Sequence, residues 1–550
     1  MSEIPEECLP PKDHLPDKIY PLPELRLPRE LNLGHLFLDR HIGEGRGSKI
    51  AIRYKDEEIT FFDFQREVNR LANALRSLGI EKNDRVMLRS PNRPEWVVAC
   101  FACWKIAAIP VLVHHQLTIE EIIFRANDSE AKAIVVSSDT FPEVGKSLDK
   151  CPFLEKVIIF GEKITGHLFY DDLLRDQSDR VQIVETTKDD WARIIYSSGT
   201  TGKSKGILAT NGDMVTAITI QSRYLLHLSP EDVFGGHSAF SFAFGFFPIL
   251  FFGIMGCTLS VIDQFTPESM FQTVESHGIT LLRCVPTLYR MMLQVKDVEK
   301  KYNVSSLRLC QSAGEWLPAP TVREWKQRFG VTILDSVGSA DLHSTISTRV
   351  DTPADKLDSS GVPLPGIDCK IVDENFDELP RGVPGELVLR APWGLQYWRR
   401  PDLQRKTVMN GWNRTGLIFV EDDDGYFWFK GRDDDMIVSS GYKIVGGEVE
   451  TALSGHDAVL EVAVIPSPDP IRGNIVKAFV ILKKGYEPSD QLADELKDFV
   501  KRSIDPYKYP RKIEFVDGKS LPRTPTGKIK RFVLRDREKE EFEKGKGNSP

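Results

Sequence analysis

A glycine-rich and hydroxyl-rich loop constrains this chain more than any other feature. The loop reads Ser-Ser-Gly-Thr-Thr-Gly-Lys-Ser-Lys-Gly over residues 197–206 and follows the apolar run Ala192–Tyr196, which predicts a buried strand. Backbone N–H groups, hydroxyls and ammonium charge gathered in one loop are typical of phosphate binding. A P-loop has a glycine five residues before its Gly-Lys-Ser, but here that position holds Ser197. The chain is therefore expected to bind nucleotide phosphates through a fold other than that of the P-loop NTPases.

Further motifs follow this loop in order along the chain. They are Ser312–Pro318, Asp335–Asp341, Gly411–Gly416, Gly431–Ile437 and Pro522–Lys530. Together with the loop, they resemble the motifs of the adenylate-forming enzymes, a superfamily that contains acyl-CoA ligases, peptide synthetase adenylation domains and firefly luciferase. The resemblance runs from about Leu31 to Arg531, and this many blocks in one order exclude a chance match.

The composition excludes several other classes of protein. A chain of 550 residues is long enough for two or more domains, and its net charge of -8 gives no basic surface for nucleic acid. Eight cysteines without compact spacing, and residues 1–27 without the apolar segment of a secretory signal, predict a cytoplasmic protein with reduced thiols. We expect small-molecule partners, no nucleic acid and no membrane span. A homodimer is compatible with the sequence.

One apolar segment resembles a membrane span and another a metal or redox site, but neither is expected to form such a site. Phe234–Ile262 contains no Asp, Glu, Lys or Arg, which by length alone would suit a membrane span. Glycines and Pro248 interrupt it, so we predict a strand, a loop and a buried helix around a substrate cavity. Cys100 and Cys103 form a CxxC motif inside an apolar helical pattern without a second ligand pair, and we expect core packing there rather than zinc or redox chemistry.

Alternating apolar strands and amphipathic helices predict an α/β fold. Thr60 and Asp63 give a helix-start signal, and the helix is expected to end at Gly79. Strands are predicted at residues 85–88, 109–113, 133–136, 157–160, 459–465 and 476–482, and one helix face at residues 492–500. We expect a large N-terminal adenylate-forming domain of stacked β-α subdomains, residues 1–432, and a small mobile α+β C-terminal domain, residues 433–550. The charged tail from residue 535 is expected to be a solvated face.

The resemblance implies an AMP-forming acid–CoA ligase that uses ATP, Mg²⁺ and coenzyme A. A carboxylate resists attack by a thiol because its charge repels nucleophiles and oxide is a poor leaving group. If the carboxylate first displaces pyrophosphate at the α-phosphorus of ATP, the product carries AMP, which leaves readily. Lys528 is implied to bridge the α-phosphate and the attacking carboxylate, and Lys205 and Thr200 to act on the phosphates. The other implied phosphate contacts are Ser197, Ser198, Gly199, Thr201 and Gly202.

Other motif positions carry implied roles in the two half-reactions. The implied adenine, ribose and AMP positions are Gly314, Glu315, Asp335, Ser336, Val337, Gly338, Leu417 and Arg432. Asp341 is the implied Mg²⁺ ligand. The small domain is implied to rotate about a hinge at Asp434, so that the thiol of CoA reaches the acyl carbon in a second conformation. The implied positions along the pantetheine of CoA are Ser440, Gly441 and Tyr442.

The implied acyl pocket is rich in phenylalanine. Its sequence blocks look most like those of the benzoate and 2-aminobenzoate CoA ligases, so an aromatic or medium-sized apolar carboxylate is expected. The implied substrate positions are His237, Phe240, Phe244, Gly245, Ala313, Ser339 and His343. Because side chains alternate along extended backbone, the phenylalanines between residues 240 and 247 are not all expected to face the ligand. His343 stands one residue earlier than the histidine of the aromatic ligases, and Ser344 is the alternative.

Three positions depart from the family pattern at the nucleotide site. The Thr-Glu pair that serves the α-phosphate and Mg²⁺ is Ala340-Asp341, and the Asp that binds the ribose is Leu417. The lost hydrogen bonds cost on the order of 4 to 7 kcal/mol unless a neighbour such as Glu421 or Asp422 compensates. Two hypotheses follow: a working ligase, or a non-catalytic or ATP-impaired member that binds nucleotide or acyl-CoA. Release of pyrophosphate only in the presence of an acid separates the two.

Overall fold

The computed structural model describes residues 4–197, 204–314, 317–339, 342–432, 436–439, 442–470, 472–523 and 529–547. Its internal contacts divide the chain into two compact units. Unit 1 comprises Met1–Ser197, Ser204–Cys369 and Leu389–Arg414, and unit 2 comprises Ser198–Lys203, Lys370–Val388 and Thr415–Pro550. The domain boundary predicted after residue 432 stays a prediction.

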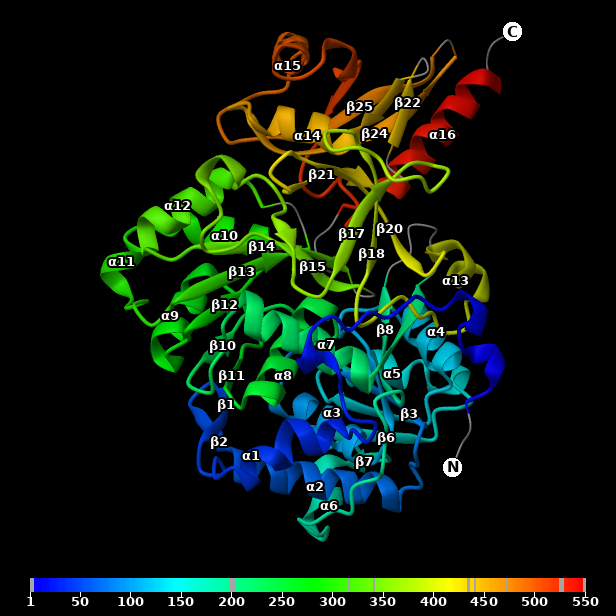
Figure 1. Cartoon of the computed structure of the whole chain (residues 1–550), viewed down its shortest axis with the longest axis vertical. Coiled ribbons are helices and arrows are strands. Elements are labelled where there is room, and N and C mark those ends of the chain that lie inside the picture. Colours follow the sequence, from blue (N-terminus) through cyan, green and yellow to red (C-terminus); the bar gives the residue numbers. More distant parts are fainter. Residues whose placement is uncertain are drawn as a thin grey trace. The chain divides into compact units, whose positions relative to one another are not determined.

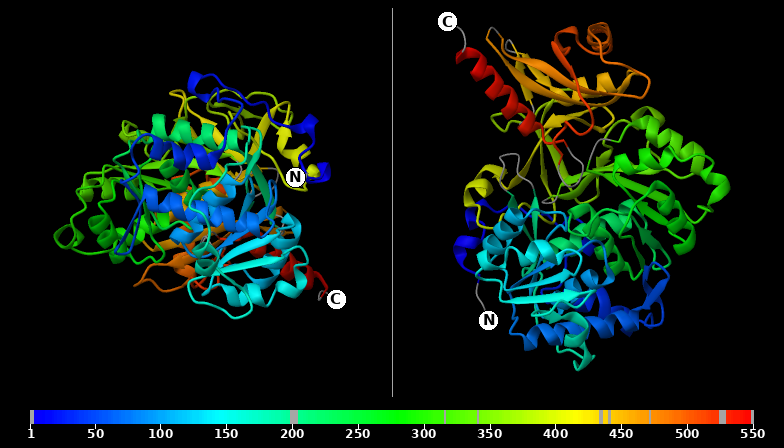
Figure 2. Two further views of the ribbon diagram at one scale, coloured as in Figure 1. Left: turned by 90° about the horizontal axis from the view of Figure 1, so that it is seen from below. Right: turned by 180° about the vertical axis from the view of Figure 1, so that it is seen from behind.

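A seven-stranded sheet carries the first part of unit 1. In spatial order its strands are β7 (Leu168–Phe169), β6 (Lys156–Phe160), β5 (Ala133–Ser137), β3 (Arg85–Arg89), β4 (Ile109–Leu112), β8 (Trp191–Ser197) and β9 (Lys205–Thr210). The strands are parallel except for β9, which runs antiparallel to β8. Several of them are blue to cyan in the view from behind (Figure 2, right).

A nine-stranded sheet carries the second part of unit 1. Its order is β16 (Val362–Pro363), β15 (His343–Ser347), β14 (Ile333–Ser339), β13 (Leu309–Ala313), β12 (Leu281–Arg283), β10 (Val233–Gly235), β11 (Thr258–Val261), β1 (Ile50–Tyr54) and β2 (Glu57–Thr60). The strands from β14 to β1 are parallel, so their carboxyl ends meet at one edge. In open α/β sheets this edge is where ligands bind.

Helices cover both faces of the two sheets in unit 1 (Figure 1). The helices of unit 1 are α1 (Arg40–Gly43), α2 (Phe61–Ser77), α3 (Pro94–Lys105), α4 (Ile119–Ser129), α5 (Phe141–Gly145), α6 (Tyr170–Arg175), α7 (Asn211–Ile220), α8 (Ala243–Met255), α9 (Pro267–His277), α10 (Pro286–Leu293), α11 (Val298–Lys301), α12 (Ala319–Phe329) and α13 (Pro401–Thr407), the last of which lies beside β19. Helices α2, α3, α7 and α8 share one apolar core with residues of both sheets, such as Val86 and Leu281. Helices α4 and α5 cover the other face of the first sheet, and α9, α10 and α12 cover the other face of the second. The stacked β-α layers predicted for this unit are thereby confirmed.

A five-stranded sheet contains β17 (Asp368–Val372), β18 (Gly385–Arg390), β20 (Trp412–Glu421), β19 (Val408–Met409) and β21 (Phe427–Arg432). Unit 2 also contains an α+β part. Its elements are β22 (Met436–Ser439), β23 (Tyr442–Val445), α14 (Gly446–Ser454), β24 (Val459–Asp469), β25 (Gly473–Leu482), α15 (Asp490–Ser503), β26 (Lys512–Phe515) and α16 (Arg531–Gly547). Helices α14 and α15 pack on one face of the β24–β25–β26 sheet, and α16 packs on the other.

Local signals in the sequence account for several of these elements. The Thr60 side chain accepts a hydrogen bond from the N–H of Asp63 and starts α2, as predicted. The uncharged segment 234–262 forms β10, α8 and β11, and α8 has only 13 residues. No helix in the described ranges is both long and apolar enough to cross a bilayer. Cys100 and Cys103 are both buried in α3, which confirms the prediction of core packing.

Candidate active site

The base of the phosphate loop is a strand hairpin in unit 1. Strands β8 and β9 pair so that Ser197 lies opposite Lys205, which brings the two ends of the loop together. The Nζ atom of Lys205 lies 3.3 Å from the hydroxyl of Tyr397 and 4.8 Å from the centre of its ring. The Oγ atom of Ser197 is buried without a hydrogen-bond partner in the described part of the chain. The predicted residues Ser198, Gly199, Thr200, Thr201 and Gly202 lie outside the described residues.

The positions predicted to contact adenine lie at the carboxyl ends of β13 and β14. Gly314 has a φ of +92°, which side-chain-bearing residues rarely adopt. A Cβ atom on Gly338 would lie 1.9 Å from the carbonyl oxygen of His343, so only glycine fits there. The Ser336 hydroxyl bonds within the sheet to Gln311 and Ser347 and therefore has a structural role. The side chain of Val337 is half-buried, and Glu315 lies outside the described residues.

Asp335 is the buried acid of this edge. Its backbone pairs with that of Ser312 in the parallel β13–β14 ladder, so the two side chains lie on the same face. Within the described ranges, neither Oδ1 of Asp335 nor Oγ of Ser312 has a hydrogen-bond partner. Burial raises the pKa of Asp335 to about 8, so the carboxyl group is largely protonated at neutral pH. Two polar groups at one sheet edge are thus available to a ligand.

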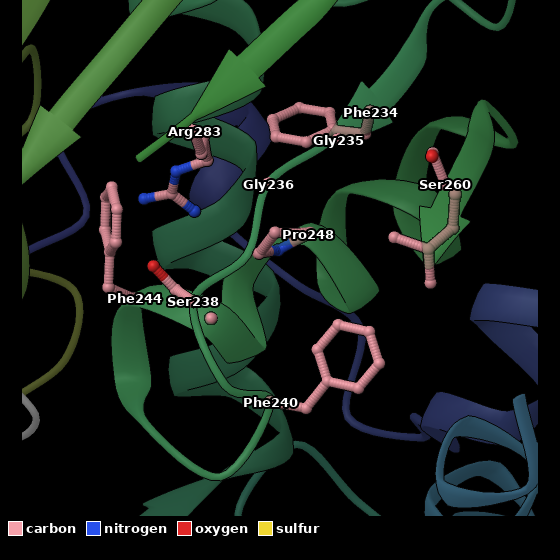
Figure 3. Close-up of a pocket in the computed structure, with 11 residues that line it drawn as sticks. Phe234, Gly235, Gly236, Ser238, Phe240, Phe244, Pro248, Ser260 and Arg283 are labelled. Carbon is pink, nitrogen blue, oxygen red and sulfur yellow. The ribbon is translucent and has the colours of Figure 1, made fainter. Parts of the chain in front are cut away.

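A small cavity lies next to β10, β11, β12 and α8, where some of the predicted substrate positions lie (Figure 3). Of the predicted substrate residues, Phe240, Phe244 and Gly245 line this cavity. Phe240 is buried and packs on Trp96, with ring centroids 5.6 Å apart. A Cβ atom on Gly245 would lie 2.0 Å from the carbonyl oxygen of Ala239, so glycine is required where α8 meets the preceding loop.

The other predicted substrate residues are not in the wall of the cavity. His237 follows β10 and stacks on Phe265, and burial lowers the pKa of its imidazole. His343 has a φ of +55° and packs edge-on against Phe247 and Trp393. The side chain of Ser339 is exposed, and Ala313 is buried within β13.

Arg283 also lines the cavity, and the sequence analysis missed it. It ends β12 and is buried, with its guanidinium group 4.0 Å from the centre of the Phe244 ring. The signal in the sequence was a single charge closing the apolar stretch from Ile279 to Leu282. A charge at the end of a predicted strand usually indicates only the boundary of the strand, so the sequence did not predict a functional role for Arg283.

The positions predicted to contact the ribose lie in unit 2 on the paired strands β20 and β21. Leu417 is opposite Arg432 in this ladder. Glu421, proposed as a substitute for the ribose-binding acid, forms an ion pair with Arg381 at 2.9 Å. Asp422 accepts hydrogen bonds from the Trp428 indole and from two backbone N–H groups in the following turn. Both carboxylates are therefore already engaged, which argues against their recruitment to the ribose.

Several of the remaining predicted residues lie outside the described residues. They are Asp341, Asp434, Ser440, Gly441 and Lys528. Tyr442 starts β23 and pairs with Ser439 of β22. The predicted roles of all these positions stay predictions.

The fold and this edge of the sheet define an adenylate-forming α/β enzyme. The model of the AMP-binding enzyme family matches residues 39–398, and that of the AMP-binding enzyme C-terminal domain matches residues 448–528. The chain therefore belongs to the AMP-binding enzyme family.

Individual relatives cover almost the whole chain. It is 36% identical to mitochondrial acyl-coenzyme A synthetase ACSM4 of Mus musculus, covering 94% of this chain and 92% of that protein. It is 35% identical to benzoate–CoA ligase of Thauera aromatica, covering 93% and 97% of the two chains. The crystal structure of the anthranilate CoA ligase AuaEII in complex with anthranoyl-AMP superimposes with a TM-score of 0.86 at 32% identity, covering 93% of this chain and 98% of that one. These comparisons confirm the predicted class, an AMP-forming acid–CoA ligase with ATP and CoA as co-substrates.

Proposed function

We propose that this ligase activates an aromatic or medium-sized carboxylic acid with an apolar body. The observation that carries the proposal is the phenylalanine-lined cavity next to β10, β11 and β12 in a member of the AMP-binding enzyme family. The names of two relatives, a benzoate–CoA ligase and an anthranilate CoA ligase, support an aromatic acid. In our proposal the apolar walls contact the apolar body of the acid, and the activated carboxylate then faces the nucleotide.

The described residues fit binding and orientation of ATP. In our proposal, Lys205, placed at the end of the phosphate loop, supplies positive charge to the phosphates. The protonated carboxyl group of Asp335 can both donate and accept a hydrogen bond, which suits the amino group and adjacent ring nitrogen of adenine. Lys528 then neutralises the developing charge as the carboxylate oxygen attacks the α-phosphorus and pyrophosphate leaves. In the second half-reaction the thiol of CoA attacks the acyl carbon, and AMP leaves.

Mg²⁺ fits the proposal through the phosphates rather than through a cluster of protein ligands. Among the described residues, no group of three or more His, Cys, Asp or Glu side chains is placed to hold a metal. Mg²⁺ bound to nucleotides commonly takes one or two carboxylates together with phosphate oxygens and water. Asp341 is our proposed carboxylate, and bound Mg²⁺ would offset charge on the triphosphate.

A reducing compartment such as the cytoplasm is our proposed location. It is supported by the cysteines, all eight of which are free, and seven of which are buried. A homodimer is compatible with the proposal, and light scattering of the purified protein measures its mass directly.

Pyrophosphate release tests the proposal. The purified protein is given ATP, Mg²⁺ and CoA with benzoates, aminobenzoates, phenylacetates or fatty acids of two to ten carbons. Release is expected only with an acid, and Lys528→Ala should abolish it, while Lys530→Ala is the matched control. The absence of pyrophosphate release with every acid tested would contradict the proposal.

The second candidate is a member that binds ligand without turnover. The engagement of Glu421 and Asp422 favours it, because neither carboxylate is available to replace the acid missing at Leu417. This candidate predicts a thermal shift with ATP or acyl-CoA but no pyrophosphate.

A further inference from the structure

Arg283 is a buried charge for which the described residues offer no hydrogen-bonding or ionic partner. Its side chain lies at the end of β12, and the residue is 1% exposed. In the described part of the chain, none of its three guanidinium nitrogens has a hydrogen-bond partner, and no carboxylate pairs with it. Burial lowers its pKa to about 9, so the group still carries its charge at neutral pH. Burial of an unpaired ion strongly destabilises a folded protein. A bound molecule that pairs with Arg283 is therefore the simplest explanation for the buried charge.

Other buried arginines of unit 1 are satisfied within the chain at least in part. Arg85 donates to the backbone carbonyls of Ser129 and Glu130 and to the Glu130 carboxylate. Arg89 donates through Nη1 to the carbonyl oxygens of His114 and His115, and its Nη2 lies 3.8 Å from a carboxylate oxygen of Glu143, although its Nε and Nη2 have no hydrogen-bond partner in the described ranges. Arg283 has aromatic contacts instead, which stabilise a cation but leave its five N–H donors unused.

The surroundings of Arg283 direct it toward the acyl cavity. Its guanidinium group lies between 4.0 and 5.5 Å from the ring centres of Phe244, Phe247 and Phe251. Ser238 lines the same cavity, and its buried hydroxyl is also without a partner within the described ranges. Figure 3 shows the Ser238 oxygen and the Arg283 guanidinium group pointing toward the same space beside Phe244. Two unused polar groups thus meet inside an otherwise apolar pocket.

This pair fits an anionic oxygen group better than an apolar one. A planar guanidinium binds a carboxylate through two parallel hydrogen bonds, and a hydroxyl adds a third donor. The free volume of the cavity is about 10 Å³, close to the space of one water molecule. A carboxylate therefore fits once the partly exposed ring of Phe244 moves aside, and a much larger group does not.

We propose that Arg283 and Ser238 bind a second carboxylate of the substrate, so that the acid activated by this protein is a dicarboxylic acid with a short apolar body. The inference rests on the proposed ligase function and names its substrate class. The first carboxylate is activated by ATP, and the second stays ionised and bound to Arg283.

Matched acid pairs test the inference in the full-length protein. Pyrophosphate release is measured with benzoate against the three benzenedicarboxylates, and with hexanoate against adipate. For at least one pair, the wild-type kcat/KM is expected to be tenfold or more higher for the dicarboxylate. In Arg283→Met, kcat/KM for that dicarboxylate should fall about a hundredfold, while the monocarboxylate is used as well as before or better. Ser238→Ala should lower only the dicarboxylate rate, by a smaller factor.

Arg283→Lys keeps the charge and covers the case in which Arg283→Met does not fold. It should retain part of the preference because an ammonium ion makes no bidentate contact. Arg85→Lys is the matched control at a buried arginine of another sheet, and it should leave the ratio between the two acids unchanged. A wild-type preference for monocarboxylates, or a ratio that Arg283→Met and Arg283→Lys do not change, overturns the inference.

Binding without turnover separates the two proposals. Each acid alone is added to the wild type and to Arg283→Met, and thermal unfolding is followed. A dicarboxylate that stabilises the wild type but not the variant supports the role of Arg283 even if no acid releases pyrophosphate, in which case only the ligase proposal fails. Release with monocarboxylates, without any effect of dicarboxylates, upholds the ligase and rejects the inference.

Discussion

Two buried cations in this molecule have opposite surroundings. Arg283 in unit 1 and Lys477 in unit 2 both lie on strands and are each 1% exposed. Lys477 lies 2.8 Å from a carboxylate oxygen of Glu514 and also pairs with Glu538, which accepts a further hydrogen bond from Ser467 at 2.7 Å. Arg283 contacts aromatic rings and has no carboxylate partner among the residues described.

The difference separates a structural charge from a binding charge. The Lys477 network joins β25 and β26 to α16 and leaves its ions compensated, so its role is complete within unit 2. At the carboxyl edge of the nine-stranded sheet, Arg283 and Asp335 are both incomplete, one on each face. Buried ionisable groups with perturbed pKa values are a common mark of functional sites.

The largest expected effect comes from breaking the complete network. Lys477→Met leaves the Glu538 carboxylate buried without its cation, so we expect a loss of about 3 to 5 kcal/mol in the free energy of unfolding of unit 2. Hydrogen exchange of the β24–β25 hairpin, followed against denaturant, measures it. Lys484→Met, an exposed lysine near the same hairpin, is the control. A loss under about 1 kcal/mol would mean that the network adds little.

The pH dependence of the same variant has a definite sign. Burial opposes ionisation of Glu538, but hydrogen bonds from Lys477 and Ser467 outweigh it and hold the pKa of Glu538 below its ordinary value. Burial likewise disfavours charged Lys477, but Glu514 and Glu538 raise its pKa. The wild-type contribution is thus present above about pH 4.3, is lost as pH falls through the lowered pKa of Glu538, and is also lost as pH rises through the raised pKa of Lys477. In Lys477→Met the stability deficit should shrink as pH falls, because a buried Glu538 without its cation is protonated more readily than in the wild type.

Replacing Arg283 by methionine should stabilise the protein, whereas the same replacement of Lys477 should destabilise it. Arg283→Met removes an uncompensated ion and keeps an apolar side chain, so we expect the unliganded protein to gain about 1 to 3 kcal/mol in stability. Thermal unfolding of the wild type and the variant without acid measures the difference. Arg85→Met is the matched control, and it should destabilise because Arg85 is satisfied by Ser129 and Glu130. If both variants destabilise alike, the distinction between the two kinds of charge is wrong.

A third substitution, Leu417→Asp, adds a carboxylate at a position where the ribose of the bound nucleotide is expected to be its hydrogen-bond partner. Leu417→Asp restores the carboxylate that the family resemblance places at the ribose, and it should tighten ATP binding about tenfold or more, since each charge-assisted hydrogen bond contributes about 1.5 to 3 kcal/mol. Isothermal calorimetry measures the dissociation constant. Leu417→Asn offers one acceptor without charge and should give a smaller gain. An unchanged affinity in both variants would show that residue 417 does not reach the ribose.

Sequence patterns predicted the elements whose signals are local. The cap at Thr60 and the spacing that follows it predicted α2, and β3 and β5 agree with the predicted strands to within one residue at their ends. The motif order was enough to predict the family and the AMP-forming ligase class, because each motif carries its own chemistry. Motif residues alone do not tell which of them reach a cavity: Phe240 and Phe244 line it, and His343 does not.

Pairing over long sequence separation was beyond these patterns. The charged tail from residue 535 was predicted to be solvated, which is wrong for Glu538: in α16 it is buried against Lys477, 61 residues earlier in the chain. Charge composition favours solvent, and only the fold brings a buried cation to that carboxylate. The lack of a partner for Arg283 among the described residues could not be predicted either, because it depends on how side chains pack in three dimensions.

The last expected effect is a pH dependence, and it concerns the second unpartnered group, Asp335. Because burial raises its pKa in the folded state to about 8, well above the value of about 3.9 in an unfolded chain, the folded protein holds one more proton between these limits. The stability contribution is therefore complete below about pH 4 and is lost as pH rises toward 8, with a slope of roughly 1 kcal/mol per pH unit.

Asp335→Asn cannot ionise, so its stability relative to the wild type should rise from pH 5 to pH 8. Chemical denaturation at four pH values measures this slope, and Asp232→Asn, at an acid paired with Arg308, should lack such a rise. Parallel curves for the wild type and Asp335→Asn would mean that Asp335 has a partner in solution, and the contrast between the two units would then rest on Arg283 alone.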